Sequence, residues 1–371
     1  MSKKANMTVV LLFILYLFIL FSLNLFWPDQ VFSEKENRYL QSFPSFSFSS
    51  LKRGDYTASI EDYCSDHFIG RNSWISLKAR LELLQGKREN NGVFLCSGER
   101  LIEPFADPGA PETERRINTI NDFSKRIPVP TVFALIPTSA ELYSGLLPPG
   151  ASNDSQKSFI SSVYSRVDTD TADIIGALAP YSDDYIFYRT DHHWTTFGAS
   201  CAYSSLAAAL RIPKHNDYHI RVVSDSFLGS AYSSSGFFWI HPDTMETYID
   251  VPENIAVERY ESDEPEIGKI YVPEMLDTKD KYRFFLGGNS PRIVIRTGNE
   301  NLPSLLIIRD SFADTLVPFF LDDYSEIHLL DLRYYHDSAA EYVSRQGIDS
   351  VLILYSTASF ISDSGIFLLN R

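Results

Sequence analysis

The sequence predicts an α/β fold, a three-layer α/β/α sandwich with a parallel central sheet, and three observations support this prediction. The C-terminal part alternates between short apolar runs and helical stretches, as chains do when helices connect parallel strands. A predicted helix earlier in the chain is also followed by a buried apolar run. A serine follows the first C-terminal strand, at the sheet edge where open α/β folds place their chemistry. The predicted C-terminal strands are Leu305–Ile308, Glu326–Leu332 and Ser350–Tyr355.

Local signals along the chain predict the remaining elements. Apolar residues at helical spacing predict a helix over Asp55–Leu84, which ends at Gly86. Pro111 and Pro128 bound a second helix over Glu112–Arg126. Further predicted elements are the strands Thr131–Ile136 and Tyr185–Arg189, and the helices Asp154–Val167, Phe197–Leu210 (capped by Thr195 or Thr196) and Ser338–Gln346.

The alternation of strands and helices is interrupted at residues 215–285, which we predict to be a strand-rich insertion. Aromatic runs such as Phe237–Ile240 alternate there with acidic stretches such as Glu258–Glu266. Residues 28–50 are rich in Ser, Phe and Pro, and we predict a tether there. The predicted parts are a transmembrane anchor or signal at 1–27, a tether and N-terminal helical segment at 28–109, and the α/β domain at 110–371 with an insertion at about 215–285.

The N-terminus carries one segment long enough to cross a membrane. Lys3 and Lys4 precede an apolar run from Met7 to Trp27. A helix needs roughly 20 apolar residues to span the hydrocarbon core of a bilayer. Because the lysines should stay cytoplasmic, we expect everything after Pro28 to lie outside. A cleaved signal peptide is the alternative, although no small-x-small cleavage site follows the apolar run.

Composition narrows the set of partners. The chain has 371 residues, of which 44% are hydrophobic, and its formal net charge is −15. This charge opposes binding to nucleic acid and to anionic membrane surfaces, since both favour clustered cations, but it leaves neutral sugars open. The three cysteines, Cys64, Cys96 and Cys201, are too few for a disulfide scaffold, although one Cys64–Cys96 bridge would be compatible with an extracellular location.

Two motifs supply the three parts of a serine-hydrolase triad. The segment Tyr188–Phe197 contains Asp191 and His193, two residues apart, so one loop can carry both an orienting carboxylate and a base. Ser311 follows the apolar run that ends at Ile308, which places its hydroxyl at the edge of the predicted sheet. Together they indicate ester chemistry. Taken separately, Ser311 could be a helix N-cap, and Asp191 and His193 could be a structural hydrogen-bonded pair.

The run from Thr190 to Thr195, Thr-Asp-His-His-Trp-Thr, resembles the signature of the bacterial DHHW family. That family is similar to the SGNH-hydrolase-like proteins of alginate O-acetylation, which carry an Asp-x-His-Trp element. The resemblance extends over nearly everything after the first 30 residues. The other matching segments, in order, are Glu36–Arg38, Asp62–Phe68 with Arg71, Asn91–Val93, Ile136–Thr138, Phe285–Asn289 and Asp310–Phe312.

This resemblance implies an SGNH-like fold and an acyl-transfer or deacylation reaction on a cell-surface polysaccharide. Asp191, His193 and Ser311 would be the triad. The partners would be the polysaccharide, an acyl donor and a membrane-bound acyl-exporting protein, and no cofactor is implied. One departure is Arg309, which stands where SGNH enzymes usually have a glycine before the Asp-Ser pair.

Several further residues are candidates for oxyanion or substrate contacts. The Ser311 backbone N–H would be one oxyanion donor. Gly288 and Asn289 resemble the glycine and asparagine that donate in SGNH enzymes, and a turn between two strands is the alternative. The other substrate-side candidates are Thr138, Ser139, Arg309 and His192; for His192, packing or a structural hydrogen bond is the alternative.

Two other functions compete with the triad. Asp-His-His also begins metal-dependent phosphoesterase sites, but these need supporting Asp and His motifs that we do not find, so we predict no metal. The second competitor is a non-catalytic glycan-binding or assembly-scaffold protein that retains the fold. Arg309 favours this scaffold, whereas the intact Asp, His and Ser favour an enzyme. We therefore predict a membrane-anchored, extracytoplasmic O-acetyltransferase or acetylesterase.

Overall fold

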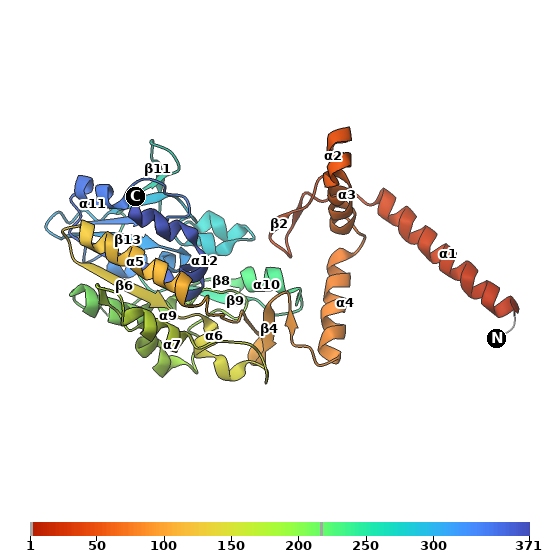
Figure 1. The fold of residues 1–371 in the computed structure, drawn as a ribbon, viewed down its shortest axis with the longest axis horizontal. Helices are drawn as coiled ribbons and strands as arrows, with labels where there is room; N and C mark the ends of the chain where they lie inside the picture. The colour runs from red at the N-terminus through yellow and green to blue at the C-terminus, as the bar shows by residue number, and fades with distance from the viewer. Residues whose placement is uncertain (1–2, 216–217) are drawn as a thin grey trace. The chain divides into compact units, whose positions relative to one another are not determined.

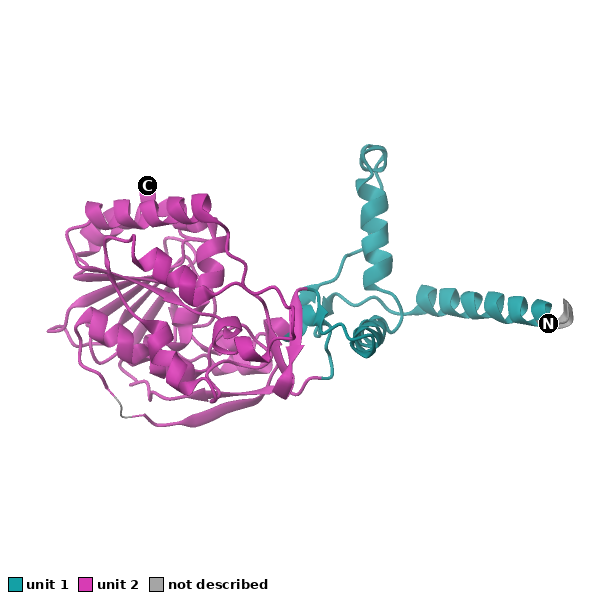
Figure 2. Cartoon of the chain, turned by 60° about the horizontal axis from the view of Figure 1, so that its bottom comes forward, with its two compact units in different colours: residues 1–91, 232–239 teal, residues 92–231, 240–371 magenta. Residues whose placement is uncertain are grey.

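The computed structural model describes residues 3–215 and 218–371, and it divides into two compact units. Unit 1 comprises residues 1–91 and 232–239, and unit 2 comprises residues 92–231 and 240–371 (Figure 2). Cys64, Cys96 and Cys201 form no disulfide in the structure, so the Cys64–Cys96 bridge is not present. The part boundaries predicted at residues 27 and 109 stay a prediction.

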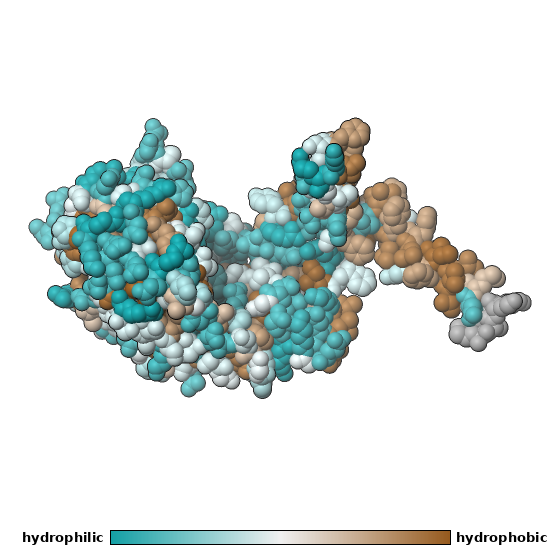
Figure 3. Space-filling model, in the orientation of Figure 1, coloured by the Kyte–Doolittle hydropathy of each residue, from teal (hydrophilic) through white to brown (hydrophobic). Residues whose placement is uncertain are grey.

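Unit 1 begins with a long apolar helix, α1 (Lys3–Phe26). Its Asn6–Phe26 stretch is long and apolar enough to cross a membrane, and none of it is buried in the structure. Figure 3 shows this helix as an almost continuous apolar surface. The helix therefore fits a membrane anchor or a signal segment by length and composition.

The helix predicted over Asp55–Leu84 is two helices, α3 (Asp55–Asp66) and α4 (Arg71–Leu84). The break falls at Gly70, whose φ of 68° is incompatible with a continuous right-handed helix. The other elements of unit 1 are short: the β1 (Phe32–Ser33) and β2 (Arg38–Tyr39) pair, helix α2 (Phe48–Arg53) and strand β3 (Glu89–Asn90).

Unit 2 is built on an eight-stranded sheet, which confirms the predicted α/β class (Figure 1). Five neighbouring strands are parallel, and the other three continue the sheet in antiparallel pairing. The parallel strands, in spatial order, are β14 (Glu326–Leu330), β13 (Ser304–Arg309), β15 (Ser350–Ser356), β6 (Thr131–Ile136) and β7 (Asp170–Thr171). The antiparallel strands are β12 (Arg292–Arg296), β10 (Ala256–Tyr260) and β11 (Glu266–Gly268).

Helices cover both faces of this sheet, so the three-layer prediction is also confirmed. Alternate residues of β13 enter opposite cores: Leu305 and Ile307 pack on one face, Leu306 and Ile308 on the other. The first face is covered by α8 (Ile174–Leu178) and α9 (Thr196–Leu210). The second is covered by α5 (Ala110–Arg126), α7 (Gln156–Tyr164) and α11 (Ala339–Gln346).

The segment at residues 215–285 is strand-rich, as predicted, but it does not stand apart from the main sheet. Strands β10 and β11 extend that sheet beyond β12. They do so because the apolar residues of β12 need a paired neighbour, and Val257 of β10 lies opposite Ile295. The remaining strands of the segment, β8 (Arg221–Phe227) and β9 (Asp243–Thr247), form a separate antiparallel pair.

Candidate active site

The histidine motif lies on a loop between the sheet and α9. The strand predicted over Tyr185–Arg189 is absent, and only an isolated bridge joins Phe187 to Trp194. The loop is instead held by the buried carboxylate of Asp243, which accepts hydrogen bonds from the Thr190 N–H (2.8 Å) and the Thr190 hydroxyl (2.6 Å). The predicted cap of α9 is confirmed, because the Thr195 hydroxyl accepts from the Gly198 N–H.

Ser311 stands in the turn that leaves strand β13. It is the first residue of a short 3₁₀ helix, η6 (Ser311–Thr315). Asp310 caps this helix, accepting from the Phe312 N–H at 3.0 Å and from the Ser356 N–H at 2.8 Å. Because Asp310 performs the capping that was an alternative role for Ser311, the serine hydroxyl remains available for other contacts.

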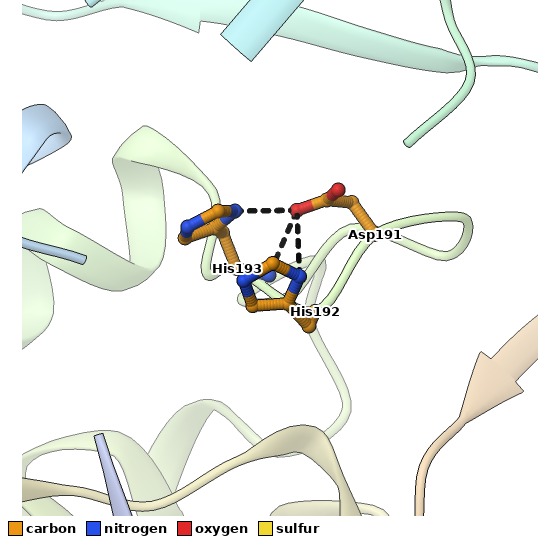
Figure 4. Close-up of side chains that lie close together, drawn as sticks. All are labelled: Asp191, His192 and His193. Carbon is orange, nitrogen blue, oxygen red and sulfur yellow. Dashed lines mark hydrogen bonds and ion pairs between the residues drawn. The ribbon is translucent and has the colours of Figure 1, made fainter. Parts of the chain in front are cut away.

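The loop and the turn bring Asp191, His193 and Ser311 into one hydrogen-bonded chain. His193 Nε2 lies 2.7 Å from Ser311 Oγ, and His193 Nδ1 lies 2.6 Å from Asp191 Oδ1. Figure 4 shows the carboxylate of Asp191 facing the His193 ring. The second carboxylate oxygen accepts from the Ser230 N–H at 2.7 Å. With the His193 proton on Nδ1, the serine hydroxyl can donate to Nε2, which is the arrangement of a serine-hydrolase triad.

Burial and neighbouring charges determine the protonation of this chain. Burial, followed by repulsion from His192, lowers the pKa of His193 to about 4, although Asp191 opposes this shift. Burial alone would raise the pKa of Asp191, but attraction to His193 and His192 and the hydrogen bonds from His193 and Ser230 place that pKa below its ordinary value. At neutral pH His193 is therefore a neutral base beside an ionised carboxylate.

This electrostatic arrangement predicts the acidic limb of the pH–rate profile. Protonated His193 cannot accept the Ser311 proton, so activity should fall only as the pH drops through about 4, well below the ordinary histidine range. The groups facing the ring are Asp191, His192, Asp310 and the stacked Tyr282. His192→Gln removes the neighbouring ring whose electrostatic interaction lowers the pKa of His193, so the midpoint in kcat/KM should move to higher pH. Identical midpoints near the ordinary value of about 6.5 in both proteins would contradict this account.

Two aromatic residues fix the histidine and the serine relative to each other. The Tyr282 ring stacks on the His193 ring at 3.7 Å between centroids, and its hydroxyl donates to the Ser311 carbonyl at 3.2 Å. Trp194 is fully buried and donates through Nε1 to the Phe312 carbonyl (3.0 Å) and the Thr315 hydroxyl (2.8 Å). Trp194 thus holds the histidine loop against the turn that carries Ser311, whereas Tyr282 lies outside both sequence motifs.

Close packing also explains why a glycine, Gly229, lies behind the carboxylate of Asp191. An added Cβ at Gly229 would lie 2.2 Å from Asp191 Cβ and Oδ2. Any larger residue would push the carboxylate away from His193 and would also disturb the Ser230 N–H that binds it. The sequence signal at Gly229 is weak, because the glycine lies far from both motifs along the chain.

Three predicted substrate-side residues lie together at a cavity of about 280 Å³. Thr138, Ser139 and His192 line it, and so does Phe312, the residue after Ser311. His192 is 40% exposed, and its Nδ1 lies 2.6 Å from the Ser230 hydroxyl. Both of its predicted roles are therefore compatible with the structure, because the ring makes a structural hydrogen bond and also faces the cavity.

Arg309 does not lie where a substrate could contact it. Its side chain is fully buried and forms an ion pair with Asp314 at 2.7 Å. Burial raises the pKa of Asp314 to about 7, although the Arg309 charge opposes this shift. The alternation of side chains along a strand explains the discrepancy: Arg309 follows Ile307 on the same face of β13 and points into the protein.

Gly288 and Asn289 lie on the turn that enters β12. The first residue of β12, Arg292, pairs with Leu330 at the carboxyl end of β14, so this turn is at the same sheet edge as Ser311. Gly288 is buried, and Asn289 is exposed and accepts from Arg333 at 3.2 Å. Their predicted oxyanion role stays a prediction.

Asp191, His192 and His193 also form a group that could hold a metal, with ligand atoms within 4.8 Å of one another. However, His193 uses both ring nitrogens in contacts with Asp191 and Ser311. A metal at this position would have to displace the Asp191–His193 hydrogen bond. The arrangement therefore favours a triad over a metal centre.

Fold and site together define a three-layer α/β/α protein with a Ser-His-Asp constellation at the edge of its sheet. The family model for the DHHW protein matches residues 131–330, just over half of the sequence. The chain therefore belongs to the DHHW family.

Several solved structures are similar to the chain, to different degrees. A DHHW family protein from Eubacterium siraeum DSM 15702 is 25% identical with a TM-score of 0.67, over 76% of this chain and 96% of that one. PatB1 from Bacillus cereus is 20% identical with a TM-score of 0.65, over 75% and 98%. The O-acetyltransferase domain of AlgJ from Pseudomonas putida is 14% identical with a TM-score of 0.48, over 76% and 99%. No curated protein sequence matches the chain.

Proposed function

We propose that this protein is an O-acyltransferase or esterase that acts on a cell-surface polysaccharide through Ser311, His193 and Asp191. The observation that carries the proposal is the unbroken hydrogen-bond chain from the Ser311 hydroxyl through His193 to Asp191, with distances of 2.7 and 2.6 Å. A neutral imidazole within hydrogen-bond reach of a hydroxyl is what nucleophilic acyl chemistry requires.

The proposed reaction has two halves. Ser311 Oγ attacks the carbonyl of an acyl ester while His193 Nε2 takes the hydroxyl proton. The tetrahedral intermediate collapses, His193 returns the proton to the departing alcohol, and an acyl-serine remains. His193 then deprotonates a sugar hydroxyl or water, which attacks the acyl-serine and frees Ser311. Asp191 stabilises the imidazolium in both halves.

Charge on the intermediate needs hydrogen-bond donors. Within residues 3–215 and 218–371, no acceptor binds the Ser311 backbone N–H, which leaves it available as one donor. We propose Gly288 or Asn289 as the source of a second donor, because their turn lies at the same edge of the sheet. Two such donors would stabilise the oxyanion in the way known for acyl-transfer enzymes.

Arg309 no longer supports the alternative of a non-catalytic scaffold. On sequence grounds it favoured that alternative, since it replaces a glycine next to the nucleophile. Its side chain turns into the core and pairs with Asp314, while the Ser311 hydroxyl keeps its contact with His193. The enzyme is therefore the better-supported function.

The experiment that tests this proposal compares the two adjacent histidines in the full-length protein. His193→Ala should abolish hydrolysis of a small acetyl ester, because it removes the base that contacts Ser311. His192→Ala should leave measurable turnover, since His192 contacts Ser230 instead. The reverse order of activities would mean that the base is His192, and equal activity in all three proteins would refute the triad.

The proposed placement is a single-pass anchor with the site outside the cell. We propose residues 1–27 as the anchor, 28–109 as the linking segment and 110–371 as the acyl-transfer domain. A polysaccharide of the cell surface would then lie within reach of the tethered site, and a membrane-bound acyl-exporting partner would supply the acyl donor. Lys3 and Lys4, at the start of the apolar helix, support this orientation.

Protease accessibility tests that placement. The full chain should remain in the membrane fraction at its full mass, and a protease added from outside should digest everything beyond about residue 28. A shortened soluble protein that begins near Pro28 would show a cleaved signal peptide instead. Complete protection from the protease would contradict the surface-polysaccharide substrate.

A further inference from the structure

The cavity beside the triad is far larger than an acetyl group needs. Its volume is about 280 Å³, whereas an apolar cavity of about 150 Å³ is already large enough to hold benzene, a group of six carbons. An acetyl group has only three non-hydrogen atoms. If the protein transferred only acetyl, the transferred group would therefore fill only a small part of the cavity.

The wall of this cavity is mostly apolar. Leu101 and Phe105 contribute from the segment before α5, and Ala358 and Ile361 from α12 (Thr357–Ser362). Phe312 connects the cavity to the chemistry, because it follows Ser311 and its ring lies 4.9 Å from the His193 ring. A group attached to Ser311 Oγ thus starts beside an apolar wall that continues into the cavity.

Five polar residues line the wall, Glu103, Thr138, Ser139, His192 and Ser362, and three of them already make hydrogen bonds. The Thr138 hydroxyl accepts from Gln156 at 2.7 Å, and the Ser362 hydroxyl donates to the Ala358 carbonyl at 2.7 Å. His192 Nδ1 is in contact with Ser230. A sugar ring carries several hydroxyls that each need a partner when buried, and most of this wall offers none. Glu103 and Ser139 are the two lining residues left to bind polar groups, so the apolar part of the cavity suits an alkyl chain better than a sugar.

We propose that the cavity is an acyl-chain pocket and that the protein transfers acyl groups of about four to eight carbons in preference to acetyl. This inference rests on the proposed function and specifies its acyl donor. The chemistry is unchanged: Ser311 Oγ forms the new ester bond to the acyl carbon, and the alcohol of the donor ester leaves with the proton held by His193. The alkyl chain extends past Phe312 into the cavity.

The test uses the full-length protein in one detergent, with acetyl, butanoyl, hexanoyl and octanoyl esters of the same alcohol. kcat/KM should rise at least about ten-fold from acetyl to hexanoyl, because each buried methylene adds binding. Ala358→Phe narrows the cavity from an exposed helical position, and should lower the hexanoyl-to-acetyl ratio at least about ten-fold. Ala208→Phe, an exposed helical alanine on α9, is the matched control and should leave the ratio unchanged.

The outcomes separate this inference from the proposed function. Turnover that depends on Ser311 but is fastest with acetyl would overturn the acyl-chain pocket and keep the enzyme. An Ala358→Phe variant with an unchanged ratio but a raised KM for a sugar acceptor would assign the cavity to the acceptor, and would also overturn it. Turnover that does not depend on Ser311 would refute both proposals.

Discussion

Replacing Ser311 by alanine is expected to reduce ester turnover by roughly 10⁴–10⁶-fold, because the members of a triad act as a unit. The substitution removes only the hydroxyl that lies 2.7 Å from His193 Nε2. The turn itself should persist, since Asp310 makes its capping bonds to Phe312 and Ser356 independently of that hydroxyl. kcat/KM for a small ester, measured beside the thermal midpoint, should therefore show a loss of activity without a loss of stability.

Ser226→Ala is the control for this substitution. Ser226 is an exposed serine on β8, so its replacement should change neither activity nor stability. Comparable turnover in the wild type and in Ser311→Ala would eliminate the serine as nucleophile. Inhibition by chelators with recovery on adding manganese would instead support the metal alternative at Asp191, His192 and His193.

The second large effect concerns the buried pair behind the nucleophile. Asp314→Leu should lower the free energy of unfolding by about 3–5 kcal/mol, because Arg309 stays charged and is left without its partner. Arg309→Met should cost less, since Asp314, whose pKa is already raised to about 7, can take up a proton. The double replacement should recover most of the loss, because both buried charges are gone.

The sign of the pH dependence distinguishes the two single variants. Folding raises the pKa of Asp314, so the protonated carboxyl stabilises the fold at low pH, and this contribution is lost as the pH rises through about 7. Arg309→Met should therefore be less destabilised at pH ~5 than at pH ~8. In Asp314→Leu this titrating group is absent, so the variant's own free energy of unfolding should not show the fall through about pH 7 that Asp314 causes. Asp322→Leu, at an exposed neighbouring carboxylate, should change stability by less than about 0.5 kcal/mol.

Much of the fold could be predicted because strands and helices leave periodic signals in the sequence. Thr131–Ile136 is strand β6 with the predicted bounds, and Ser350–Tyr355 differs from β15 by one residue. The strand over Tyr185–Arg189 was wrong because its apolar residues pack in a loop held by Asp243, a partner far away in sequence. Local patterns carry no information about such a partner.

The candidate site could be predicted only in part, for a similar reason. The histidine motif indicated Asp191 and His193, and the end of an apolar run indicated Ser311. The structure brings these three residues together. Tyr282 could not be found in this way, because its stacking on His193 depends on the path of a distant segment. Arg309 was one of the substrate-side candidates, but its side chain points into the core, a direction that the sequence around it does not reveal.

The central claim is that Ser311 is acylated, and mass spectrometry of the intact protein tests it most directly. A sulfonyl fluoride, which forms a stable bond with an activated serine hydroxyl, is a suitable probe beside a slowly released acyl ester. We expect one label per chain, carried by the peptide that contains Ser311, and no label in Ser311→Ala. His193→Ala should label far more slowly, because the base is missing. A label on another residue, or equal labelling of Ser311→Ala, would contradict the account.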